Sequence, residues 1–319
     1  MDLLFPIKWV IELLLVGFHS LFGFFGLSPD SGLSWVLSVV GLVLVVRSAL
    51  IPLFVKQIKS QRNMMIVQPE LQKLQKKYKG KNDRESREKF AKEQMDLYKR
   101  TGSNPLSSCL PILVQIPIFM GLFFTLNGAQ AQKQGVGPMS SQLAIQFSEA
   151  SLFGAKLSET FLTATTIQVQ ILAGIMVVLM SASQFITQKQ IIAKNQNPAV
   201  QNSQYMQTQK ILLYIFPLIF VISGVTFPIA VITYWLTSNF WTMGQQFIVI
   251  RNMPTDGSPA YQARIDRLAK KGKLPKELQE KLDAEAAAKA AAEAEEKTQR
   301  EQPKGKNRAK KDSKKKKKK

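Results

Sequence analysis

The sequence has few of the residues that most enzymes and metal sites use. Its 319 residues include one cysteine, Cys109, and one histidine, His19. A single cysteine excludes a disulfide bond within the chain, and no cluster of cysteine and histidine offers ligands for a metal ion. We therefore expect no metal site, and we expect His19, which stands alone among apolar residues, to have a structural role.

Acidic residues are also scarce. The chain has 22 Asp and Glu against 43 Lys and Arg, a formal net charge of +21, and its longest apolar runs between residues 33 and 250 contain no acid. An intramembrane protease would need a nucleophile with a base, a pair of aspartates or a metal site in those runs. A glycine-rich phosphate loop is missing as well. We therefore expect no enzyme activity and no cofactor.

Long apolar runs, in contrast, are abundant up to residue 250 and almost absent after it. A run of about 20 residues suffices for a helix to cross the hydrocarbon core of a bilayer. The sequence therefore predicts an all-α polytopic membrane protein. Its five core transmembrane helices are expected at about 33–55, 105–126, 165–187, 211–226 and 229–250.

Residues 1–30 precede this five-span core, 31–250, and leave two interpretations open. The apolar stretch 5–27 is nearly long enough to span a membrane, but it contains Lys8, Glu12 and His19. It is either an amphipathic helix that lies in the membrane interface or an additional span.

The distribution of basic residues predicts the orientation of the chain. Segment 56–103 has fourteen Lys and Arg against six acids, and segment 251–319 has 22 against 11. Loop 189–210 has three lysines and no acid, whereas 128–164 has two residues of each sign. Loops rich in Lys and Arg stay in the cytoplasm. We therefore expect the first three of these segments, including the C-terminus, in the cytoplasm and the fourth outside.

Segment 56–103 predicts a cytoplasmic helical hairpin. Apolar residues recur every three or four positions on both sides of Gly80, and Asp83 can cap the second helix. The two apolar seams are expected to face each other or a partner. Their main members are Met64, Leu71, Leu74, Phe90 and Tyr98.

The tail, 251–319, is expected to be largely disordered. Residues 277–300 have high helix propensity and are expected to form a solvated or semi-rigid spacer, and residues 304–319 are expected to be disordered because like charges at high density repel. The tail ends in six lysines, Lys314, Lys315, Lys316, Lys317, Lys318 and Lys319. Such a run binds polyanions through counterion release. The candidates are ribosomal RNA and anionic phospholipids. A tail that merely stays solvated is the alternative.

The first predicted span carries a full positive charge at Arg47. This residue lies eight positions before Val55, so about 12 Å from the end of the span. Charge inside a span costs at least about 2.5–3.5 kcal/mol and usually faces a wet cavity, although a long side chain can also reach back to the headgroups. No acid in the spans can pair with Arg47, so we expect a solvated cavity walled by amides and hydroxyls such as Gln115, Gln184, Gln188 and Tyr234.

These residues resemble the YidC/Oxa/Alb membrane insertase family from about residue 35 to 251. The similarity rests on the arginine-then-proline pattern at 47–52, on segments 61–69 and 97–99, and on the highly specific stretch Asn104-Pro-Leu-Ser-Ser-Cys-Leu-Pro-Ile-Leu-Val-Gln-Ile-Pro-Ile-Phe119. The last span adds Phe227-Pro228, Tyr234-Trp235, Ser238-Asn239 and Gln245-Gln246. Since no large domain precedes the spans, the chain is most similar to the short forms of Gram-positive bacteria.

The resemblance implies a groove that is open to the cytoplasm and to lipid and closed outside, in the plasma membrane of a bacterium. Arg47 matches the groove arginine of the family. Further groove positions match Gln184 or Gln188 and Tyr234 or Trp235, and the substrate contacts implied are Phe119, Met180 and Trp235.

The function implied is that of an insertase and folding chaperone. It would move hydrophobic segments of nascent membrane proteins into the bilayer, alone or with the Sec translocon, with a mobile hairpin and a tail that holds ribosomes. Two rival hypotheses remain at this point. The chain could be a transporter or channel with Arg47 as an anion site, or a tether whose spans only anchor the tail.

Overall fold

The structure is a computed structural model that describes residues 2–101, 110–196 and 204–276 and scattered positions from 278 to 294. Cys109, the first residues of the predicted span 105–126, the end of the predicted hairpin and the six terminal lysines lie outside the described residues. Contacts divide the chain into two units, Met1–Gln262 and Ala263–Lys319. The described elements are α1 (Phe5–Phe24), α2 (Gly32–Ala49), α3 (Ile51–Tyr78), α4 (Arg84–Arg100), α5 (Leu110–Gln130), α6 (Ser141–Glu149), β1 (Ser151–Leu152), β2 (Ala155–Lys156), α7 (Ile167–Lys194), α8 (Gln204–Thr226), α9 (Ile229–Asn252) and α10 (Pro259–Lys270).

Five of these helices are long and apolar enough to cross a membrane. They are α1, α2, α7 and the segments Leu113–Gln130 of α5 and Gln207–Thr226 of α8. The predicted all-α polytopic class is therefore confirmed. Helix α9, predicted as the fifth span, is 24 residues long but is not among the five, because hydroxyl and amide side chains lower its hydropathy.

The first span ends earlier than predicted. Helix α2 stops at Ala49 rather than near residue 55, and α3 begins at Ile51 with Pro52 in its first turn. Proline has no N–H to donate and clashes with the preceding turn, so it ends one helix and starts the next. From there α3 continues for 28 residues through Pro69 and into the hairpin.

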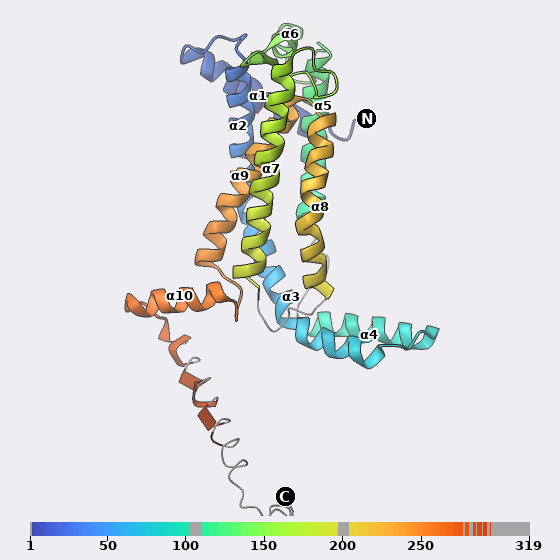
Figure 1. Ribbon diagram of the computed structural model, residues 1–319, viewed down its shortest axis with the longest axis vertical. Coiled ribbons are helices and arrows are strands. Elements are labelled where there is room, and N and C mark those ends of the chain that lie inside the picture. Colours follow the sequence, from blue (N-terminus) through green and yellow to red (C-terminus); the bar gives the residue numbers. More distant parts are fainter. Residues whose placement is uncertain are drawn as a thin grey trace, which may run out of the picture. The chain divides into compact units, whose positions relative to one another are not determined.

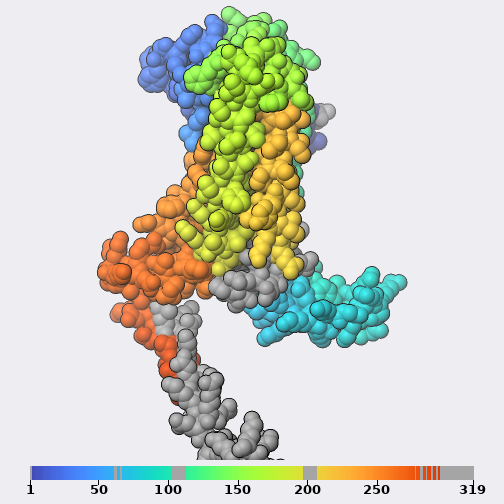
Figure 2. Space-filling model, viewed as in Figure 1, coloured from blue at the N-terminus to red at the C-terminus, as the bar shows by residue number. Residues whose placement is uncertain are grey.

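Helix α9 lies between α2 and α7, and α7 also packs on α8 (Figure 1). The first four residues of α9, from Ile229 to Ile232, are buried in the main apolar core. Helices α7 and α8 lie side by side on the face drawn in Figure 2. Their approach is close because Gly224 has no side chain, and a Cβ there would clash with Cγ2 of Val177.

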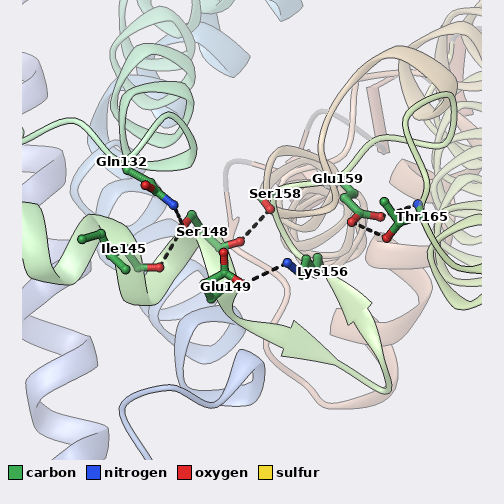
Figure 3. Close-up of polar contacts among 8 residues, drawn as sticks. All are labelled: Gln132, Ile145, Ser148, Glu149, Lys156, Ser158, Glu159 and Thr165. Carbon is green, nitrogen blue, oxygen red and sulfur yellow. Dashed lines mark hydrogen bonds and ion pairs between the residues drawn. The ribbon is translucent and has the colours of Figure 1, made fainter.

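One end of the bundle is covered by α6, the β1–β2 hairpin and the loop that leads to α7 (Figure 1). Ser148 connects these parts: its hydroxyl receives a hydrogen bond from Gln132 Nε2 (3.2 Å), and its carbonyl accepts one from Ser158 Oγ (2.8 Å) (Figure 3). Lys156 pairs with Glu149 at 2.9 Å. The same loop satisfies the free N–H groups at the start of α9, since Ile229 N donates to the carbonyl of Glu159 at 3.0 Å. We call this part, residues 131–166, the cap.

Helix α1 crosses from α5 to α2 beside the cap. A Cβ on Gly121 of α5 would meet Ile7, and one on Gly41 of α2 would meet Phe18. Large apolar side chains at the opposite face of α1 remain exposed, among them Phe5, Trp9, Val10, Leu13 and Leu21.

The three polar residues that left α1 ambiguous each have a partner in the structure. Lys8 pairs with Asp2 at 2.7 Å. Glu12 is buried and accepts hydrogen bonds from backbone N–H groups of the cap. His19 contacts the hydroxyl of Ser34 at 3.0 Å and stacks on Trp35, with ring centroids 3.8 Å apart. These contacts give His19 a structural place in the α1–α2 packing.

Helices α3 and α4 pair as a hairpin at the end of the bundle opposite the cap (Figure 1). Their seams face each other: Val67, Leu71, Leu97 and Tyr98 form one buried cluster, with Met64 against it. Phe90 contacts the ring of Tyr78, Leu74 lines the groove between the helices, and the Asp83 carboxylate caps α4 through the N–H of Ser86 (2.8 Å).

Candidate functional site

A cavity of about 400 Å³ surrounds the side chain of Arg47. Four helices contribute to it, because Arg47 stands in the last turn of α2, α3 starts beside it, and α5 and α9 close the other sides. Six of the ten lining residues carry a polar side chain. The lining residues are Arg47, Phe54, Gln57, Ile58, Gln115, Ile116, Phe119, Thr242, Gln245 and Gln246.

Arg47 is held by uncharged partners. Its Nη2 donates to the hydroxyl of Ser238, a buried residue of α9. The guanidinium carbon lies 5.8 Å from the centre of the Phe54 ring, within the range of a cation–π contact. Within the described residues no carboxylate pairs with it. The cavity therefore presents a cation that no carboxylate of the described residues neutralises.

Other polar groups continue the wall along α5 and α9. Gln115 Nε2 donates to Tyr234 Oη at 2.6 Å, which joins the two helices beside Arg47. Thr242, Gln245 and Gln246 follow on α9 toward its C-terminal end. This side of α9 is thus a polar stripe within a membrane-spanning bundle.

An aromatic cluster separates the cavity from the cap. Phe119 stacks on Trp235 with centroids 5.2 Å apart and an interplanar angle of 12°. Phe227 meets Trp235 edge-on at 5.0 Å, and Phe123 meets Phe227 at 5.7 Å. Helix α5 runs toward the cap and α9 runs away from it, so these rings lie on the cap side of Gln115 and Arg47. The cavity is therefore bounded on its cap side by an apolar layer.

The structure brings together some of the predicted site residues. Arg47, Gln115 and Phe119 line the cavity, Tyr234 bonds to its wall, and Trp235 stacks on Phe119.

The predicted residues of α7 lie elsewhere. Gln188 donates to Gln209 of α8, neither Gln184 nor Gln188 lines the cavity, and Met180 is fully buried in the core. Sequence reasoning missed Phe54, Gln57 and Ile58, because it places Phe54 at the end of the first span and the other two in the cytoplasmic hairpin.

The cavity can solvate a polar or acidic segment. Among the residues that the structure describes, no three of His, Cys, Asp and Glu come together as a metal site. The polar lining consists of one guanidinium, amides and a hydroxyl. Such groups exchange hydrogen bonds with a polar ligand and compensate its loss of water.

Comparisons with known proteins agree with this architecture. The profile of the family described as 60Kd inner membrane protein matches residues 26–256. A protein of Streptomyces avermitilis named membrane protein insertase YidC is 48% identical over 275 residues, covering 83% of this chain and 61% of that protein. A protein of the same name from Tropheryma whipplei is 40% identical over 285 residues, covering 86% of this chain and 92% of its own length. One from Bifidobacterium longum is 37% identical over 262 residues, with 81% and 78% covered.

The chain thus spans about three fifths of the Streptomyces relative and nearly all of the Tropheryma relative. The family match includes α2 to α9 and therefore the whole cavity. With its apolar helices and these bacterial relatives, the chain is a multi-pass bacterial membrane protein, and it belongs to the family of 60Kd inner membrane proteins.

Proposed function

We propose that the chain is a membrane protein insertase that moves apolar segments of nascent proteins into the bilayer through the Arg47 cavity. The observation that carries this proposal is a guanidinium within the bundle that lacks a carboxylate partner among the described residues and faces a polar cavity. The names of the relatives at 37–48% identity support it.

The physical role of the cavity is to lower the barrier for the polar flank of a substrate. A flank that crosses hydrocarbon without partners loses its hydrogen bonds to water. Amides and Arg47 replace part of that solvation, and an acidic flank is attracted in addition. The apolar segment then moves into lipid because burial away from water is favourable. An acidic flank that moves outward also gains about 2.3 kcal/mol per charge for each 100 mV of membrane potential.

The orientation and partners belong to the same proposal. The hairpin α3–α4, loop 189–210 and the C-terminus lie in the cytoplasm, since they carry the surplus of Lys and Arg. The cap lies outside, and α1 lies in the outer interface, where its exposed apolar face meets lipid. Nascent membrane proteins are the substrates. The Sec translocon, ribosomes and anionic phospholipids are partners, the latter two through the basic tail.

Replacement of Arg47 tests the role of the cavity. We expect Arg47→Ala to lower insertion of a single-span substrate with an acidic flank by about tenfold, which corresponds to about 1.4 kcal/mol. Arg47→Lys should retain much of the activity if charge is what matters. The matched control is Lys156→Ala, which removes a cation from the cap.

Insertion is measured in proteoliposomes at equal amounts of folded protein. Unchanged insertion by Arg47→Ala would contradict the proposal and would favour the hypothesis that the spans only anchor the tail. Normal insertion together with loss of anion flux would favour a transporter.

A further inference from the structure

A second groove lies between α3 and α9, next to the Arg47 cavity. It has a volume of about 450 Å³, and almost its whole surface is apolar. Ile58 and Gln245 form the wall that both spaces share. The lining residues are Ile51, Val55, Ile58, Phe240, Trp241, Gly244, Gln245, Ile248, Val249 and Met253.

The surface of this groove is suited to hydrocarbon. Its one amide, Gln245, already accepts a hydrogen bond at 3.1 Å from Trp241 Nε1, the one indole N–H in the lining. The indole N–H and the amide oxygen are therefore paired with each other, and the remaining lining has no polar side chain. Ile51, Phe240 and Ile248 are large apolar side chains exposed at the rim. A polar ligand would lose its hydrogen bonds to water here without replacement.

The volume distinguishes between apolar occupants. One turn of a helix about 10 Å across and 5.4 Å high fills roughly 420 Å³. The groove therefore accommodates only about one turn of a transmembrane helix, whereas the slim chain of a lipid fits along it. Its volume lies within the range of about 300–1,000 Å³ that is usual for ligand sites.

The surroundings indicate the headgroup. The groove lies at the start of α3 and toward the end of α9, where the apolar spans give way to basic sequence. On α3, Lys59 is exposed and lies one turn after Val55, on the face that lines the groove. Basic residues directly beside a membrane span attract anionic lipids. The tryptophan in the lining is also typical of the membrane interface.

From this combination we propose that the α3–α9 groove binds one acyl chain of an anionic phospholipid, with its phosphate near Lys59. The lipid would form part of the wall beside Ile58 and Gln245, so its hydrocarbon would separate the polar cavity from the surrounding bilayer. This inference concerns a lipid site and does not depend on the insertase activity.

Quenching of Trp241 by brominated lipids tests the proposal. The full chain is reconstituted in nanodiscs of unbrominated phosphatidylcholine that contain a few mole per cent of dibrominated phosphatidylglycerol or dibrominated phosphatidylcholine. The signal of Trp241 is the difference between the full chain and Trp241→Phe. We expect saturable quenching at low mole fraction by the anionic lipid, with a preference of about fivefold, the factor that one lysine near a charged surface supplies.

Two variants and one matched control locate the site. Gly244→Leu fills the groove, because a Cβ at Gly244 meets no atom within 4 Å, and it should abolish saturable quenching. Gly174→Leu on α7 adds the same side chain in equally open space and should leave the quenching unchanged. Lys59→Glu should abolish the preference for the anionic lipid over phosphatidylcholine. This second variant tests the proposal if Gly244→Leu does not fold.

Three results would overturn the proposal. Equal quenching by both lipids in proportion to their mole fraction would mean ordinary contact with bulk lipid. Saturable quenching that persists in Gly244→Leu would place the site elsewhere. A photoreactive side chain at position 55 could crosslink to a nascent apolar segment and to no phospholipid. That result would mean that the groove binds substrate.

Discussion

The contact between Glu12 and the cap gives a quantitative prediction about α1. Glu12 is only 1% exposed, and its carboxylate accepts hydrogen bonds from the backbone N–H groups of Val136 (2.9 Å) and Gly137 (2.7 Å), with Met139 N farther away at 3.4 Å. The loop can approach this closely because residue 135 is glycine. A Cβ there would clash with Glu12 Oε2. The loop of the cap therefore closes around one carboxylate.

We expect Glu12→Gln to weaken this contact by about 3 kcal/mol. A hydrogen bond to a charged group contributes about 1.5–3 kcal/mol, and the new amide also turns an NH₂ group toward N–H donors. Since 1.4 kcal/mol corresponds to a factor of ten, local opening should become at least about a hundredfold more frequent. The side chain keeps its size, so the change reports on charge and hydrogen bonding.

Hydrogen exchange of the Val136 and Gly137 amides in the full chain in nanodiscs measures this opening. The control is Glu149→Gln, which removes an exposed carboxylate paired with Lys156 in the same cap. It should leave the protection of Val136 and Gly137 nearly unchanged, because exposed ion pairs are screened by water. Equal protection in wild type and Glu12→Gln would refute the reasoning, since α1 would then be held by its apolar contacts alone.

Two further predictions concern the hairpin and the cavity wall. Hydrogen bonds from Lys77 and Tyr78 lower the pKa of Glu93, so its contribution to hairpin stability is present above its unfolded pKa and is lost as the pH falls. Hydrogen exchange in α4, corrected for its intrinsic pH dependence, should therefore rise at acidic pH in wild type and rise less in Glu93→Gln, in which only the Asp83 cap of α4 still loses its charge as the pH falls. Tyr234→Phe removes the acceptor of Gln115 and should cost about 1 kcal/mol of stability, seen as a lower Tm, while an unchanged Tm would show that water replaces the hydroxyl.

Much of the fold could be predicted because it follows from hydrophobic length and period. Runs near 20 residues indicate α2, α7 and α8, and the seams through Leu71 and Tyr98 predict two helices that pack on each other. The break at Leu50 was missed because the apolar run continues to Val55 without a change in composition. Only Pro52 signalled it, and proline in the first turn of a helix and proline inside a span look alike in sequence.

Part of the candidate site could also be predicted from the apolar runs. Arg47 stands out because a charge in an apolar run is costly, so it needs a special environment. The amides of α7 are also conspicuous in the sequence, yet Gln188 bonds to Gln209 of α8 and lies away from the cavity. Which polar residues meet depends on the rotation of each helix about its axis. That rotation is set by packing contacts between distant segments, such as Gly224 against Val177.

The continuity of α3 has a mechanical consequence. The residues Phe54, Gln57 and Ile58 in the cavity wall and the residues that hold α4 belong to one uninterrupted helix. From Gln57 to Tyr78 this helix is about 32 Å long. A rotation of the hairpin about the helix break at Leu50 would therefore also displace the lining residues on α3.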